Sequence, residues 1–206
     1  MSLKVQFVGD GAAAEFVYRH HYAKTMPAIT KVCLGLFDGS RLAGVMSWGY
    51  GTRPLHTIAA LFPSLTSEDY MELGRLCVHD DYARNTESWF MARSVELLRQ
   101  HSSGVKLLFS WADGMRGKPG YIYQACSWLY GGFIWTDTYL TDKGEIVHPR
   151  LYQTQMQEGR KDGLKCGKQP RPTSAELRRC EGLRPARHDG SPVDPHRVRK
   201  APGLRR

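Results

Sequence analysis

The sequence predicts an α/β (α+β) fold: a mixed, mostly antiparallel sheet flanked by helices, followed by a basic C-terminal tail. Two observations lead to this prediction. Short apolar runs alternate with helical patterns over residues 1–156. From residue 157 onward this periodicity stops, and proline, glycine, arginine and lysine dominate. We therefore divide the chain into a folded domain, residues 1–156, and a tail, residues 157–206, which we expect to be disordered unless bound.

The first third of the chain predicts a strand, a helix and a hairpin. Residues 4–9 have the pattern of a short strand, and residues 12–22 that of a helix. The apolar runs 29–37 and 42–50 flank an Asp-Gly pair, which is a strong hairpin signal.

Strands and helices then alternate. The expected elements are a short helix near 56–62, a strand at 71–79, a helix at 87–100, a buried strand at 105–111, a helix at 121–130 and a closing pair of strands at 133–140 and 145–147. Within the tail, one short helix near Ser174–Cys180 is conceivable. A hairpin that leads into β-α-β-α gives a mixed sheet with helices on both faces, and ligands bind beyond the carboxyl ends of its central strands.

The positive charge is concentrated in the tail. Residues 157–206 carry 14 Lys/Arg and 6 Asp/Glu, a difference of +8, whereas residues 1–156 carry 15 and 14, a difference of +1. A basic tail attracts polyanions through counterion release, and nucleic acid is the usual partner. The alternative is a solvated tail that only aids solubility.

The apolar runs and the cysteines indicate a cytoplasmic protein without membrane contact. No run approaches the roughly 20 apolar residues that span a bilayer, and the first residues have the pattern of a strand rather than a signal peptide. The five cysteines form no CxxC pair. We expect Cys33, Cys77 and Cys126, which lie in apolar segments, to be buried thiols.

Several enzyme classes are disfavoured by missing motifs. The sequence contains no Walker loop, GxGxxG, GxSxG or HExxH. These absences argue against nucleotide hydrolases, Rossmann dehydrogenases, serine hydrolases and zincins.

Asp113, His21 and Tyr22 are candidates for chemistry. Asp113 ends an apolar strand, where a carboxylate can act as a base or metal ligand; an ordinary turn aspartate is the alternative. His21 and Tyr22 close a helix, and an imidazole there can transfer a proton or bind metal. A histidine favoured by the helix dipole is the alternative.

Three further side chains are singled out by their positions. Tyr123 belongs to an aromatic helix that could stack on an extruded base, although such residues more often fill a core. Arg75 lies inside an apolar strand and needs a partner, either Glu72 or an anionic ligand. Ser88 in a first helical turn could bind an anion or act only as a cap.

The element order resembles that of the GNAT superfamily of N-acetyltransferases. In that superfamily the acyl-CoA pyrophosphate docks between the fourth strand and the following helix, which here corresponds to residues 78–88. This segment contains no glycine, which disfavours ordinary CoA binding and hence a standard acetyltransferase.

Four sequence pieces at sensible separations are similar to the Mom family of phage DNA modification proteins. They are His21-Tyr22 followed by Pro27, Glu72-Leu73-x-Arg75-Leu76, Phe109-Ser110-x-Ala112-Asp113, and Gly120-x-Ile122-Tyr123-Gln124-Ala125-x-x-Trp128-x-Tyr130-x-Gly132. The similarity covers about residues 15–150.

The resemblance implies an acyltransferase-like enzyme with a GNAT-like catalytic domain over residues 1–156. Such an enzyme converts adenine N6 in double-stranded DNA to a carbamoylmethyl (acetamido) form and protects phage DNA from host restriction in the bacterial cytoplasm. It implies His21, Tyr22, Asp113 and Tyr123 as the catalytic centre, with His21, Tyr22 and Asp113 as ligands of iron.

The resemblance also assigns Arg75 and Ser88 to the donor, which is acetyl-CoA or another activated group carrier. A homodimer is left open. The alternatives from other classes are a GNAT-type N-acetyltransferase acting on a small amine or protein, and a non-catalytic DNA-binding protein on the same scaffold.

Overall fold

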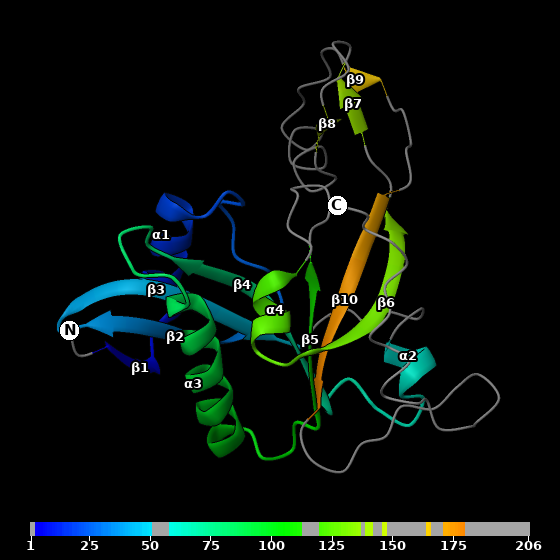
Figure 1. Ribbon diagram of the computed structural model, residues 1–206, viewed down its shortest axis with the longest axis horizontal. Helices are drawn as coiled ribbons and strands as arrows, with labels where there is room; N and C mark the ends of the chain where they lie inside the picture. Colours follow the sequence, from blue (N-terminus) through cyan, green and yellow to red (C-terminus); the bar gives the residue numbers. More distant parts are fainter. Residues whose placement is uncertain are drawn as a thin grey trace.

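Seven strands form one sheet in the order β1-β2-β3-β4-β5-β10-β6, and a small second sheet has the order β8-β7-β9 (Figure 1). The computed structural model describes residues 3–50, 58–112 and 120–136, together with strands at 139–141, 146–147, 164–165 and 171–179. The strands are β1 (Leu3–Phe7), β2 (Thr30–Asp38), β3 (Arg41–Gly49), β4 (Tyr70–Val78), β5 (Leu107–Ala112), β6 (Leu129–Thr136), β7 (Tyr139–Thr141), β8 (Ile146–Val147), β9 (Leu164–Lys165) and β10 (Arg171–Arg179). The helices are α1 (Asp10–His20), α2 (Ile58–Leu61), α3 (Thr86–His101) and α4 (Tyr121–Ala125).

The large sheet is mixed and mostly antiparallel, as predicted. Its neighbouring strands run antiparallel except β4 and β5, which are parallel. Parallel neighbours need a crossover connection, and α3 supplies it. The predicted hairpin is also present, with Asp38 opposite Arg41 and Gly39 at φ +60°, a conformation that glycine adopts without steric cost.

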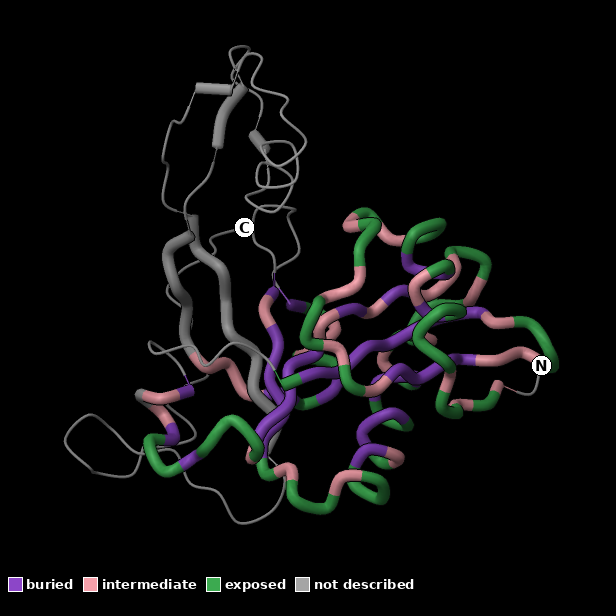
Figure 2. Tube along the Cα trace, turned by 180° about the vertical axis from the view of Figure 1, so that it is seen from behind, coloured by how far each residue is buried: buried purple, intermediate pink, exposed green. Residues whose placement is uncertain are grey.

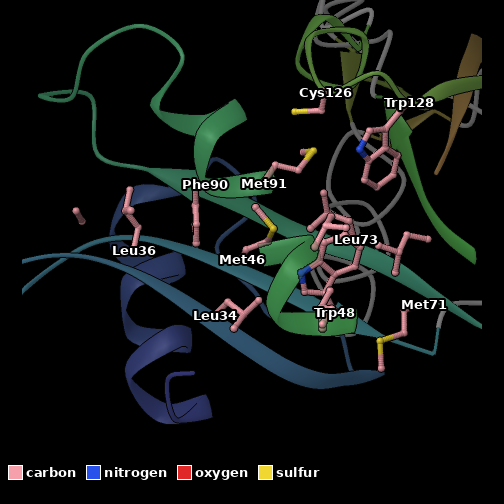
Figure 3. Packing of buried hydrophobic residues seen from close by; sticks show 14 residues of the cluster. Leu34, Leu36, Met46, Trp48, Met71, Leu73, Phe90, Met91, Cys126 and Trp128 are labelled. Atoms are coloured by element: carbon pink, nitrogen blue, oxygen red, sulfur yellow. The ribbon is translucent and has the colours of Figure 1, made fainter. Parts of the chain in front are cut away.

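Helices α1 and α3 cover opposite faces of the sheet, because successive side chains of a strand point to opposite sides. On one face, Ala13, Phe16 and Val17 of α1 pack against the sheet. Their partners are Cys33 of β2, Val45 of β3 and Cys77 of β4. On the other, α3 packs against a larger cluster that includes Leu34, Met46, Trp48, Leu73, Phe90 and Met91 (Figure 3). Figure 2 shows the buried residues running along the central strands between these two helices. Cys33, Cys77 and Cys126 are buried thiols, as predicted.

The C-terminal part differs from the prediction in three elements. The strand expected over 133–140 is divided between the two sheets, because β6 ends at Thr136 and pairs with β10 whereas β7 begins at Tyr139 and pairs with β8. The helix expected over 121–130 ends at Ala125, and Leu129 already belongs to β6. Residues 171–179 form β10, where the sequence allowed a short helix near Ser174–Cys180. β10 lies between β5 and β6 and pairs with both, so long-range pairing outweighs local helix propensity here. The division of the chain into a folded domain and a tail at residue 156 stays a prediction. The strand β10 of the large sheet lies after this position.

None of the helices in the described part of the chain is both long enough and apolar enough to span a membrane.

Candidate active site

The parallel strands β4 and β5 pair over only three positions, Tyr70–Glu72 with Leu107–Phe109. Beyond these positions β4 continues to Val78 beside β3, and β5 continues to Ala112 beside β10. Figure 1 shows the two arrows diverging from this point. In open sheets, ligands bind outside the carboxyl ends of strands where neighbours separate. The divergence is therefore the place to look for functional side chains.

Ser110 and Tyr123 meet where the strands diverge. The Ser110 side chain is buried, with 2% of its surface exposed. Its hydroxyl donates to the carbonyl oxygen of Leu73 at 3.3 Å and lies 2.7 Å from the Tyr123 hydroxyl. A serine hydroxyl has one proton, so while it is donated to Leu73, Tyr123 is the donor in the shorter bond. The Tyr123 oxygen is thereby fixed beside the divergence.

Helix α4 holds Tyr123 in this position. Gly120 precedes the helix with φ +84°, and the helix is followed by Ser127, which has φ 57°. The Trp128 ring lies 5.2 Å from the Tyr123 ring, and the Trp128 amide donates to the Tyr123 carbonyl at 2.9 Å. These contacts pack the tyrosine against the α3 face of the sheet.

His21 and Tyr22 lie on the opposite side, directly after α1. The His21 Nδ1 lies 3.0 Å from the Ala23 amide nitrogen and 3.1 Å from the Ala23 carbonyl oxygen. In either tautomer the Ala23 backbone engages Nδ1. The Tyr22 ring lies 4.3 Å from the His21 ring and is 50% exposed.

Arg75 connects the loop after α1 to β4. Its side chain is buried, with 6% exposure. The guanidinium donates from Nε to the Thr25 carbonyl at 2.9 Å and from Nη1 to the Gly74 carbonyl at 2.7 Å. Pro27 of the same loop packs on Gly74, where an added Cβ would come within 2.7 Å of its side chain. The charge inside the strand therefore has carbonyl oxygens as partners, and these bonds position the loop that carries His21.

Ser88 lies in the first turn of α3. Its hydroxyl donates to the Asn85 carbonyl at 2.9 Å. The carbonyl of Ser88 accepts a bond from the Cys126 thiol at 3.5 Å, which ties α4 to α3. Asn85 is the N-cap in a left-handed conformation and makes no side-chain capping bond. The first-turn N–H groups thus lack a side-chain cap, and the positive end of the helix dipole favours an anion there.

The predicted site residues fall into two groups on opposite faces of the sheet. His21, Tyr22 and Arg75 lie on the α1 face, and Tyr123 and Ser88 lie on the face covered by α3 and α4. Asp113 follows β5 directly but lies outside the described residues. Sequence reasoning did not select Ser110 as a site residue. The sequence signal that could have identified Ser110 was its hydroxyl, the one such group in an otherwise apolar strand.

The described residues do not form a metal site. Within the ranges that the structure describes, no three His, Cys, Asp or Glu side chains are grouped as metal ligands. Of the three ligands that the resemblance implies, His21 and Tyr22 are adjacent and Asp113 is not described. The residues that the structure describes therefore do not by themselves provide an iron site.

Comparison with known structures places the fold among the GNAT acetyltransferases. A GNAT-family acetyltransferase from Streptococcus pneumoniae superimposes with a TM-score of 0.52 at 11% identity, covering 87% of this chain and 100% of that one. The YncA protein of Salmonella typhimurium, solved with its cofactor acetyl-CoA, superimposes with a TM-score of 0.52 at 9% identity, covering 89% and 96%. These similarities establish the predicted GNAT-like fold.

Sequence comparison identifies the family. The methylcarbamoylase Mom of Escherichia phage Mu is 30% identical over 146 residues, which are 71% of this chain and 60% of that protein. The chain thus spans about 60% of the length of this relative. The model of the Mom protein family matches residues 2–182, a range that includes all the described site residues and β10. The chain belongs to the Mom protein family.

Proposed function

We propose that this protein is a transferase that modifies adenine bases in double-stranded DNA and adds a carbamoylmethyl group to N6. The observation that carries the proposal is the divergence of β4 and β5 with the Tyr123 hydroxyl fixed beside it. Membership of the Mom family and the methylcarbamoylase named in phage Mu support DNA as the substrate. Such a modification would protect phage DNA from restriction in the host cytoplasm.

The donor is proposed to be an activated carrier, related to an acyl-CoA, that bears the carbamoylmethyl group through its methylene carbon. Attack of N6 on the acyl carbon of a CoA thioester would give an N6-acyl adenine instead. A protein of the same fold was solved with acetyl-CoA. In this chain the uncapped first turn of α3 offers backbone N–H groups to a phosphate of such a donor. Ser88 lies in that turn, whereas Arg75 would act on the donor side only by holding the sheet and the loop in place.

In the transfer, one bond forms and one bond breaks. The adenine N6 loses a proton, and the leaving group of the donor gains one. The bond between N6 and the methylene carbon of the carbamoylmethyl group forms while the bond between that carbon and the donor's leaving group breaks. N6 is a poor nucleophile because its lone pair is delocalised into the ring, so a base must take its proton as the bond forms. His21 Nε2 takes this proton when Nδ1–H donates to the Ala23 carbonyl. Tyr123 gives its proton to the leaving group when Ser110 turns its own hydroxyl proton from the Leu73 carbonyl to the Tyr123 oxygen, and Tyr123 is re-protonated from solvent.

Nucleoside mass spectrometry tests the proposal. Plasmid DNA is recovered from cells that express the protein and digested to nucleosides, and the same plasmid is challenged with restriction enzymes whose sites contain adenine. We expect a deoxyadenosine species heavier by one carbamoylmethyl substituent and resistance to cleavage. The variant Tyr123→Phe should lose this species, and Tyr121→Phe, on the same helix but 73% exposed, should keep it. Unmodified deoxyadenosine in cells with folded protein, together with acetylation of an amine, would instead indicate an N-acetyltransferase.

A further inference from the structure

The α1 face carries a surface of exposed tyrosines next to His21. Tyr18 on α1 is 62% exposed, Tyr22 in the following loop 50% and Tyr50 after β3 42%. Tyr50 is placed beside this loop because Thr30, at the start of β2, pairs with Gly49. Exposed aromatic rings of this size usually serve recognition when they gather with charges of one sign.

The same surface is mostly basic. Residues 16–37 include Arg19, Lys24 and Lys31 and no Asp or Glu. Arg19 is paired with Glu15 on α1. Lys24 lies over the Tyr18 ring at 5.6 Å, and Lys31 lies over the Tyr50 ring at 5.3 Å. Neither lysine forms an ion pair with a carboxylate in the described part of the chain. Both cations therefore remain available to an external anion.

The loop that carries Tyr22 and Lys24 is held in place at its far end, by bonds to the Pro27 carbonyl and by packing against Gly49. Thr30 donates to the Pro27 carbonyl twice, from the amide at 3.1 Å and from the hydroxyl at 2.7 Å. Gly49 packs so closely on this loop that an added Cβ would lie 2.0 Å from the Ile29 carbonyl oxygen. A surface ordered before binding loses little conformational entropy when a ligand arrives. Tyr22 and Lys24 are thus presented on a loop that is ordered before binding.

We propose that the tyrosine–lysine platform, Tyr18, Tyr22, Lys24, Lys31 and Tyr50, binds DNA at the target adenine, with the lysines on phosphates and the tyrosine rings on unstacked bases. This rests on the proposed function, in which DNA is the substrate. A base inside a duplex must leave the stack before its N6 can react, and an aromatic ring accepts the face of any base. Tyr22, against His21, receives the target base, and Tyr18 and Tyr50 receive its displaced neighbours.

Salt-dependent DNA binding of the full-length protein tests the lysines. Binding to a fluorescent duplex is measured at several KCl concentrations for Lys24→Gln/Lys31→Gln and for the control Lys4→Gln/Arg99→Gln. The control removes the same charge from exposed residues of β1 and α3. We expect the slope of log K against log salt to fall by about 2 in the platform variant, since each phosphate contact contributes about 0.9. The control variant should have the same slope as the unaltered protein.

Single-stranded DNA tests the tyrosines. Tyr18→Leu and Tyr50→Leu should each weaken binding to a single-stranded oligonucleotide about tenfold. Tyr18→Phe and Tyr50→Phe should bind as the unaltered protein does, because they keep the ring.

The possible outcomes separate the platform from the function. Equal slopes for platform and control variants would overturn the platform and leave the function standing. Absence of DNA binding by the unaltered protein would instead overturn the proposed function. Loss of poly-glutamate binding in the platform variant with unchanged duplex binding would assign the surface to an acidic protein, which also overturns the proposal. Circular dichroism of each variant verifies that the fold is retained.

Discussion

The two ends of the β4–β5 pair hold their strands together in different ways. At the closed end, the Asp69 carbonyl accepts bonds from the amides of Lys106 at 2.7 Å and Leu107 at 3.1 Å. The Asp69 carboxylate adds an ion pair with the Lys106 amine at 2.7 Å. At the open end, past the last backbone pairs, the Ser110 side chain bonds to the Leu73 carbonyl at 3.3 Å.

The difference shows why functional groups gather at one end. Where the backbone pairs with itself, its polar groups are satisfied and exclude other partners. Where pairing stops, side chains must supply the missing partners, and Ser110 and Tyr123 do so here. Substitutions at the two ends should therefore have different effects.

The largest expected effect is at Tyr123. Tyr123→Phe removes the hydroxyl that we propose as the proton donor to the leaving group, and general acid catalysis contributes roughly 100-fold or more to a rate. We expect the rate of appearance of modified deoxyadenosine after induction, normalised to protein level, to fall by about this factor. Tyr121→Phe is the control on the same helix. A Tyr123→Phe variant with an unchanged rate would contradict the role of the open end.

Ser110→Ala separates positioning from catalysis. If Ser110 acts only by directing the Tyr123 hydroxyl, its removal should lower the rate less than Tyr123→Phe does and should shift the pH profile of the rate. In the Tyr123→Phe background the same change should add almost nothing. Additive losses in the double variant would show that Ser110 acts independently of Tyr123.

Arg75 should affect folding more than donor binding. Arg75→Met leaves the Thr25 carbonyl without its buried charged donor, which should lower the free energy of unfolding by about 2–4 kcal/mol. Urea denaturation measures this loss, and Arg84→Met, at an exposed position, is the control. An Arg75→Met protein of unaltered stability with a raised KM for the donor would instead make Arg75 a direct donor contact.

The sequence predicted the fold well where local patterns decide it. The Asp-Gly turn at Asp38 marked the β2–β3 hairpin, and apolar periodicity located α1, α3 and β5. It missed β10, because Arg171–Arg179 has polar local signals and becomes a strand through pairing with β5 and β6. The position of Arg75 inside an apolar strand predicted that its charge needs a partner. It could not name the Thr25 carbonyl, because that bond joins residues 50 positions apart.

The position of β10 changes how the basic tail should be tested. Deletion from residue 157 would remove a strand between β5 and β6, so a truncation should remove only residues 183–206, beyond the family match. This segment carries seven Lys/Arg and two Asp/Glu. We expect the truncated protein to show a shallower salt dependence of duplex binding, by about 0.9 for each phosphate that the removed side chains neutralise in the full-length protein. An unchanged slope would exclude these residues from DNA binding.

The smallest expected effect lies at the closed end and appears only as a dependence on pH. Hydrogen bonding from Lys106, and then from Thr66, lowers the pKa of Asp69 from 3.8 to about 2. A carboxyl whose pKa is lowered on folding stabilises the folded state fully above its unfolded pKa, and this contribution disappears as the pH falls through the folded value. Thermal unfolding of Asp69→Asn should therefore lie slightly below that of the unaltered protein at neutral pH, and the gap should narrow between about pH 4 and pH 2. Glu68→Gln, at the exposed neighbouring position, controls for the change in net charge. Equal unfolding temperatures at neutral pH would mean that the backbone bonds to the Asp69 carbonyl, which Asp69→Asn keeps, hold the closed end together without the carboxylate.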